Sequence, residues 1–197
     1  MSENSEERQD RERPRSLRLF VAIEIPRAAV TAVEAAFYPW RRAFPRIRWI
    51  PSDNWHLTLK FLGWTTPAQL PWVQGRVREV VTGSAPFEIR LSGVGAFPSA
   101  RRARVLWAGL EDEGDALALL AGALDAATSP EFAPETRSFS AHLTVGRSDP
   151  PARLPEGFET TPLRSEAWRV DRVGLFRSHP QRPFPRYELL SADPLGG

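Results

Sequence analysis

The chain has no cysteine among its 197 residues. A disulfide framework, a thiolate nucleophile and a cysteine-ligated metal site are therefore excluded. Absence of cysteine fits a reducing compartment, and we expect this protein to be cytoplasmic. The sequence also lacks an apolar run long enough to cross a bilayer and the apolar core of a signal peptide, so no membrane association is expected.

Lysine is almost as scarce, because Lys60 is the only one and every other basic side chain is arginine. The formal net charge is only +2, so the field of the whole protein is weak. Arginine presents a planar fork that binds phosphate bidentately. A genome composition that favours alanine, proline and glycine would produce the same bias, and both interpretations stay open for most of these arginines.

Histidine occurs three times, and two of the three stand in the same tripeptide, His-Leu-Thr, at residues 56–58 and 142–144. Apolar and polar residues alternate around both copies, which predicts two β-strands. Side chains two residues apart in a strand share a face. The first strand is predicted to present His56, Thr58 and Lys60 on one face and Leu57, Leu59 and Phe61 on a core face. The second is predicted to present His142 and Thr144 on one face and Leu143 and Val145 on the other.

An imidazole beside a hydroxyl, present twice, suits proton transfer at a phosphate. With a pKa near 6.5, one imidazole can act as a base while the other acts as an acid. Each threonine hydroxyl can donate a hydrogen bond to a phosphate oxygen. A single His-x-Thr is usually an ordinary half-buried pair, but the repeat in a histidine-poor chain favours a site. Metal binding is the weaker alternative, since only one further histidine is available.

The pattern along the chain predicts an α+β fold of antiparallel strands with helices on one side. Residues 1–15 are expected to form a disordered charged tail, residues 16–192 a single domain and residues 193–197 a flexible C-terminal tail. The remaining connections, including 149–162 with its four prolines, are predicted to be loops. Strands are predicted at 17–25, 46–50, 54–63, 87–94, 105–110, 139–147, 168–176 and 187–191, and helices at 27–43, 66–81 and 113–127.

Two further features admit a functional and a structural interpretation. Phe20 is predicted on the non-core face of the first strand, beside Arg18, where it could stack on a nucleobase or pack under a neighbouring loop. The basic segment 99–104 could touch a nucleic-acid backbone, but a solvated hairpin tip explains it equally well.

Three segments resemble the two-histidine phosphoesterase superfamily: residues 18–23 (RLFVAI), 56–63 (HLTLKFLG) and 142–147 (HLTVGR). Their order and spacing are most similar to the bacterial and archaeal RNA 2′,3′-cyclic phosphodiesterases, also called 2′-5′ RNA ligases. The resemblance covers about residues 17–191. It implies a bilobal fold with pseudo-twofold symmetry: two antiparallel sheets, helices on their outer faces and a central groove lined by both histidine strands.

The resemblance further implies metal-independent hydrolysis of RNA 2′,3′-cyclic phosphate ends to a 2′-phosphate, without a cofactor. It implies that His56 is the general acid and His142 the general base, and that Thr58 and Thr144 hold the phosphate. Expected partners are RNA ends, with tRNA fragments as one source, and the expected state is a monomer.

Arg147 matches a phosphate-contacting arginine of the family. Because it stands five residues after His142, a regular strand would point it to the opposite face, unless Gly146 allows a bulge. Ser178 stands where the family tends to place a serine. Ala141 replaces a frequent proline, which changes how the strand begins but not its chemistry. His179 lacks a threonine partner and is predicted to be a surface residue in a loop.

Two other functions remain open on the sequence. One is a phosphodiesterase for another cyclic or 2′-5′ nucleotide on the same fold. The other is a non-catalytic module that binds RNA ends, which the histidine pair disfavours because permanently charged arginine would grip a phosphate better.

Overall fold

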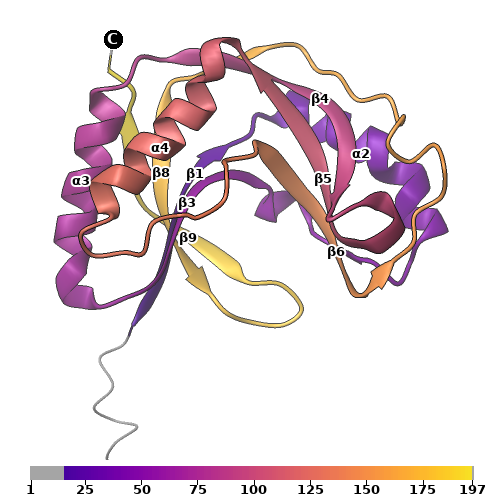
Figure 1. Ribbon diagram of the computed structural model, residues 1–197, viewed down its shortest axis with the longest axis horizontal. Helices are drawn as coiled ribbons and strands as arrows, with labels where there is room; N and C mark the ends of the chain where they lie inside the picture. Colours follow the sequence, from indigo (N-terminus) through magenta and orange to yellow (C-terminus); the bar gives the residue numbers. More distant parts are fainter. Residues whose placement is uncertain (1–15, 197) are drawn as a thin grey trace, which may run out of the picture.

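Both His-Leu-Thr copies begin neighbouring strands at the centre of one antiparallel sheet in the computed structural model, which describes residues 16–196 (Figure 1). The predicted N-terminal tail, residues 1–15, lies outside the described residues. The strands are β1 (Leu17–Glu24), β2 (Arg48–Trp49), β3 (His56–Thr65), β4 (Phe87–Phe97), β5 (Ala103–Asp112), β6 (His142–Ala152), β7 (Trp168–Val170), β8 (Arg172–His179) and β9 (Arg186–Pro194). The long helices are α2 (Arg27–Ala43), α3 (Leu70–Thr82) and α4 (Ala116–Thr128).

The strand order is β7-β4-β5-β6-β3-β1-β8-β9, with β2 paired to β6. Within this order, four strands lie on each side of a seam between β3 and β6, and that seam is joined through one paired position, Leu57 with Leu143. Each half therefore runs outward from its own histidine strand, as a pseudo-twofold arrangement requires. The α+β class is confirmed. The expectation of two separate sheets is wrong in one respect, because the seam joins the two halves into one curled sheet.

Each half of the sheet has its own helical cover and its own core. Helices α3 and α4 pack on the half formed by β1, β3 and β8, whereas α2 packs on β4, β5 and β6 (Figure 1). The fully buried side chains of α2, Val33 and Phe37, are one turn apart, as an amphipathic helix requires. The helices thus cover the face that carries Leu57 and Leu143, and they leave the histidine face uncovered.

Both histidine strands contain a β-bulge at the same place. In β3, Thr58 pairs with Ala22 and Lys60 pairs with Val21, so Leu59 has no partner on β1. In β6, Thr144 pairs with Trp107 and Gly146 pairs with Leu106, so Val145 has no partner on β5. An extra residue shifts the alternation of a strand by one. The side chains directly after each bulge therefore point to faces opposite to those of a regular strand, and in β3 a second register shift at Leu62 restores the alternation before Trp64.

The predicted faces of Lys60 and Phe61 are consequently wrong. Lys60 is 6% exposed and turns toward the helices, while Phe61 is 62% exposed and turns away from the core. The Lys60 ammonium pairs with Asp125 of α4 and donates to the Ala133 carbonyl at 3.1 Å. The bond from Lys60 lowers the pKa of the Asp125 carboxyl. The only lysine of the chain is thus a structural tie between β3 and α4.

Most predicted elements agree with the structure, including the start at Thr66, whose side chain forms a capping box with Gln69. Three segments differ. Strand β6 continues through Ala152, where a loop was expected, and the predicted strand 168–176 is divided at Asp171 into β7 and β8. The segment expected to be a flexible tail from residue 193 is anchored, because Asp193 pairs with Arg78 at 2.9 Å and Leu195 is 7% exposed.

The Lys60–Asp125 pair yields a stability prediction. Removing one partner of a buried pair usually costs about 3–5 kcal/mol, and because Asp125 is 23% exposed we expect a loss of roughly 2 kcal/mol for Lys60→Met in urea unfolding. The control is Arg76→Met, which breaks the exposed Arg76–Glu79 pair and should cost less than about 0.5 kcal/mol. Equal stability of the two variants would contradict a structural role for Lys60.

Candidate active site

The four side chains of the two tripeptides meet at the seam between β3 and β6. Leu57 and Leu143 are directly paired and point into the cores, so the residues flanking them point into the groove. Continued by one residue in each direction, this antiparallel register places His56 opposite Thr144 and Thr58 opposite His142. All four side chains are half-buried. The seam therefore gathers two imidazoles and two hydroxyls on one face.

The two imidazoles are held in the same way. Nδ1 of His56 donates to the Asn54 carbonyl at 2.9 Å, and Nδ1 of His142 donates to the Ser140 carbonyl at 2.8 Å. A carbonyl oxygen only accepts, so each bond fixes the proton on Nδ1 of the neutral ring. Nε2 of each ring is left to accept a proton from a substrate or a water, or to return one.

Aromatic side chains bury the imidazoles. The His56 ring lies 4.8 Å from the Phe20 ring and 5.0 Å from the Tyr187 ring, centroid to centroid, and His142 meets Phe97 edge to face at 5.1 Å. Burial lowers the pKa of His56 to about 4 and also lowers the pKa of His142, and the positive charge of Arg147 contributes to both shifts. Both rings are therefore neutral at pH 7 in the free protein.

Arg147 reaches the groove because of the bulge at Val145. It pairs with Val105, two residues from the partner of Thr144, so Arg147 and Thr144 share a face. The bulge that Gly146 was expected to permit is present. A Cβ at Gly146 would lie 3.1 Å from the side chains of Ile47 and of Trp49, the β2 residue that pairs with Gly146, so these two side chains lie directly against the glycine. The site thus combines a neutral histidine pair, two hydroxyls and one arginine.

Comparison with known proteins agrees with this arrangement. The family model described as LigT like Phosphoesterase matches residues 23–107 and 109–187. The chain belongs to the LigT-like phosphoesterase family. This family lies within the two-histidine phosphoesterases, so the resemblance carried by the two tripeptides is confirmed.

Curated relatives carry the name RNA 2′,3′-cyclic phosphodiesterase. The relative from Methanothermobacter thermautotrophicus is 32% identical over 82% of this chain and 90% of its own length. The relative from Thermus thermophilus is 31% identical over 92% of this chain and 91% of its own length. The relative from Geobacillus stearothermophilus is 28% identical over 90% of this chain, which spans 57% of that longer protein.

Solved structures share the fold. The protein TT0787 of Thermus thermophilus superposes with a TM-score of 0.79 at 31% identity and covers 91% of this chain and 98% of its own. E. coli LigT, solved in complex with 3′-AMP, superposes with a TM-score of 0.73 at 24% identity, over 92% of this chain and 99% of its own. The LigT-like fold therefore extends over almost the whole of this chain.

The structure adds two residues to the site that sequence reasoning missed. Tyr187 of β9 meets His56 at an interplanar angle of 87°. Asn54 holds His56 through its carbonyl and also donates from its side chain to the Pro185 carbonyl at 2.6 Å, which ties the β8–β9 connection to the histidine. Asn54 could have been found from its place two residues before His56. The position of Tyr187 depends on strand pairing and left no signal in the sequence.

Phe20 and Ser178, expected as substrate contacts, both lie on the groove face of the LigT-like site. Phe20 is 2% exposed beneath His56, so its ring offers no open face to a nucleobase. Ser178 is 7% exposed. Both side chains are therefore buried in the floor of the groove.

His179 differs from its prediction as a surface loop residue. It ends β8, half-buried, and its Nε2 lies 2.6 Å from the Glu188 carboxylate. Alternation along β8 places it on the face opposite to Ser178. It therefore takes no part in the groove chemistry.

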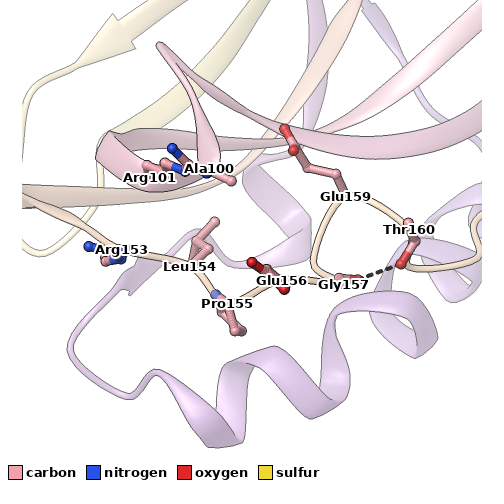
Figure 2. A pocket seen from close by; sticks show the side chains of 9 residues that line it. All are labelled: Ala100, Arg101, Arg153, Leu154, Pro155, Glu156, Gly157, Glu159 and Thr160. Atoms are coloured by element: carbon pink, nitrogen blue, oxygen red, sulfur yellow. Dashed lines mark hydrogen bonds between the residues drawn. The ribbon is translucent and has the colours of Figure 1, made fainter.

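A separate pocket of about 510 Å³ opens between the basic segment and residues 153–160 (Figure 2). Arg101 and Arg153 line it together with Glu156 and Glu159, so its charges are mixed, and none of the four groove residues borders it. Across residues 16–196, no three His, Asp or Glu side chains converge as metal ligands would. The helices of that same region include none that is long and apolar enough to cross a membrane.

The lowered pKa of His56 makes stability depend on pH. Well above pH 6.5 the His56 ring is neutral in both the folded and the unfolded protein, so it adds no pH dependence to the unfolding free energy. Between about pH 6.5 and pH 4 the ring binds a proton in the unfolded chain but stays neutral in the folded protein. Unfolding free energy should therefore fall as the pH drops, by roughly 2–3 kcal/mol from this group at pH 4.5. Urea unfolding should show that His56→Gln loses correspondingly less stability between pH 7 and pH 4.5. A parallel loss in both proteins would contradict the burial of His56.

Proposed function

We propose that this protein hydrolyses RNA 2′,3′-cyclic phosphate ends to 2′-phosphates by metal-independent acid–base catalysis. The observation that carries the proposal is the convergence of His56, His142, Thr58, Thr144 and Arg147 on one face of the seam. The names of its relatives support RNA as the substrate class. RNA ends, tRNA fragments among them, would be bound by a cytoplasmic monomer.

The proposed reaction is an in-line attack of water on the cyclic phosphorus. Nε2 of His142 takes a proton from the water as its oxygen bonds to phosphorus, the bond from phosphorus to O3′ breaks, and Nε2 of His56 gives its proton to O3′. The product keeps the phosphate on O2′. Thr58 and Thr144 donate hydrogen bonds to the phosphate oxygens, and Arg147 stabilises the negative charge that develops.

A neutral imidazole can act as a base at once, but it must gain a proton before it can act as an acid. Both imidazoles are neutral in the free protein because they are buried near Arg147. A phosphate anion between them favours the protonated form of an imidazole. The acid therefore acquires its proton when the substrate enters. With a 5′-hydroxyl in place of water, the same groups in the same roles would join it to the cyclic phosphate as the bond to O3′ breaks, which is 2′-5′ ligation.

The decisive assay uses a short RNA ending in a 2′,3′-cyclic phosphate, in excess EDTA, with identification of the product. We expect a 2′-phosphate. His56→Ala and His142→Ala should each lower kcat by roughly 10²–10⁴ because each removes one acid–base group. His179→Ala is the matched control, since this third histidine lies outside the groove, and it should retain activity.

Two outcomes would overturn the proposal. Undiminished activity in His142→Ala would exclude the acid–base assignment. RNA that binds with no product formed would indicate the non-catalytic RNA-end-binding module instead.

A further inference from the structure

Exposed apolar side chains gather on the groove face of the β1, β3, β8 and β9 half. Phe61 is 62% exposed, Trp64 is 65% exposed and Leu189 is 48% exposed. Phe61 pairs with Phe20, Phe20 with Phe176, and Phe176 with Leu189, so Phe61 and Leu189 end one row of side chains across four strands. Clustered exposed apolar surface beside a site marks a place where a ligand binds.

A second row of paired residues begins at Trp64, three residues beyond Phe61 in β3. Trp64 pairs with Arg18, Arg18 with Ser178, and Ser178 with Tyr187. Directly paired residues share a face, so the Trp64 indole and the exposed Arg18 guanidinium are neighbours on the groove face. The charge of Arg18 also acts on the pKa of Tyr187, in the direction opposite to burial. An aromatic surface and a cation therefore stand side by side beyond Phe61.

This surface is continuous with the catalytic groups. The Phe61 ring lies 6.1 Å from the Phe20 ring, and Phe20 lies 4.8 Å from His56. The second half of the sheet has no such surface, because strand pairing places Arg147 at the position equivalent to Phe61 and Ala152 at the position equivalent to Trp64. One half thus offers a cation where the other offers aromatic rings.

We propose that Trp64 and Arg18 form a second nucleotide subsite, which binds the residue preceding the cyclic phosphate end of an RNA strand. A 2′,3′-cyclic phosphate closes the 3′ end, so the chain leaves the site only on its 5′ side. Phe61 stacks on the terminal base, Trp64 stacks on the base before it, and Arg18 contacts the phosphate between them. Stacking on aromatic side chains accepts any base, so this subsite selects chain length and not sequence. The inference rests on the proposed function, since it places the RNA strand of that proposed reaction in the same groove.

The test compares kcat/KM for a mononucleotide 2′,3′-cyclic phosphate with kcat/KM for a dinucleotide that carries the same end. The unaltered protein should favour the dinucleotide. Trp64→Ala should lower the dinucleotide value roughly 5- to 150-fold, the range for one lost base stack, and leave the mononucleotide value unchanged within about twofold. Trp64→Phe should restore most of the loss. Tyr38→Ala, at a 60% exposed aromatic residue of α2, is the matched control and should change neither value.

Arg18→Gln should reduce the salt dependence of dinucleotide binding, with the slope of log K against log salt smaller by about 0.7 for one phosphate contact. Equal kcat/KM for the two substrates, or an equal loss on both in Trp64→Ala, would overturn the subsite. Turnover of neither substrate would overturn the proposed function instead. In that case, fluorescence anisotropy of a labelled RNA hexamer with a 2′-phosphate end still tests the subsite, because Trp64→Ala must weaken its binding and Tyr38→Ala must not.

Discussion

One extra residue after each threonine of the tripeptides determines what each half of the groove contains. The bulges at Leu59 and Val145 turn the fifth residue after each histidine into the groove and the fourth toward the helical side. In β3 the fourth residue is Lys60, which pairs with Asp125. In β6 it is Gly146, over which Ile47 and Trp49 pack closely. A regular strand at either place would remove Arg147 or Phe61 from the site.

The same backbone geometry therefore presents an aromatic side chain in one half of the groove and a cation in the other. Pseudo-twofold symmetry is retained where acid–base groups are needed, because His56 and His142 each donate Nδ1–H to the carbonyl two residues earlier. The symmetry is broken at the fifth residue, which is Phe61 on one side and Arg147 on the other. This asymmetry suits the proposed substrate, which carries a charged phosphate and an aromatic base.

Local patterns in the sequence predicted helix α2 to the residue and located the four groove residues. The features that these local patterns did not predict depend on strand pairing. Alternation alone put Lys60 in the groove and Phe61 in the core, because a bulge is visible only once the partner strand is known. The single seam between β3 and β6 and the contact of Tyr187 with His56 join segments far apart in the chain. Arg147 was expected from resemblance, and its orientation needed the bulge.

Burial of the histidines under aromatic rings controls the charge of the groove. Two protonated imidazoles beside Arg147 would place three positive charges in a half-buried site. Burial and the repulsion between like charges both disfavour that state. Burial instead leaves both rings neutral at pH 7, beside the one cation whose charge lowers the pKa of both, Arg147. A cyclic phosphate diester brings one negative charge, and the attack of water adds negative charge on phosphorus. In the proposed reaction, one imidazole can then hold a proton at little electrostatic cost, so the substrate itself would create the acid that its hydrolysis requires.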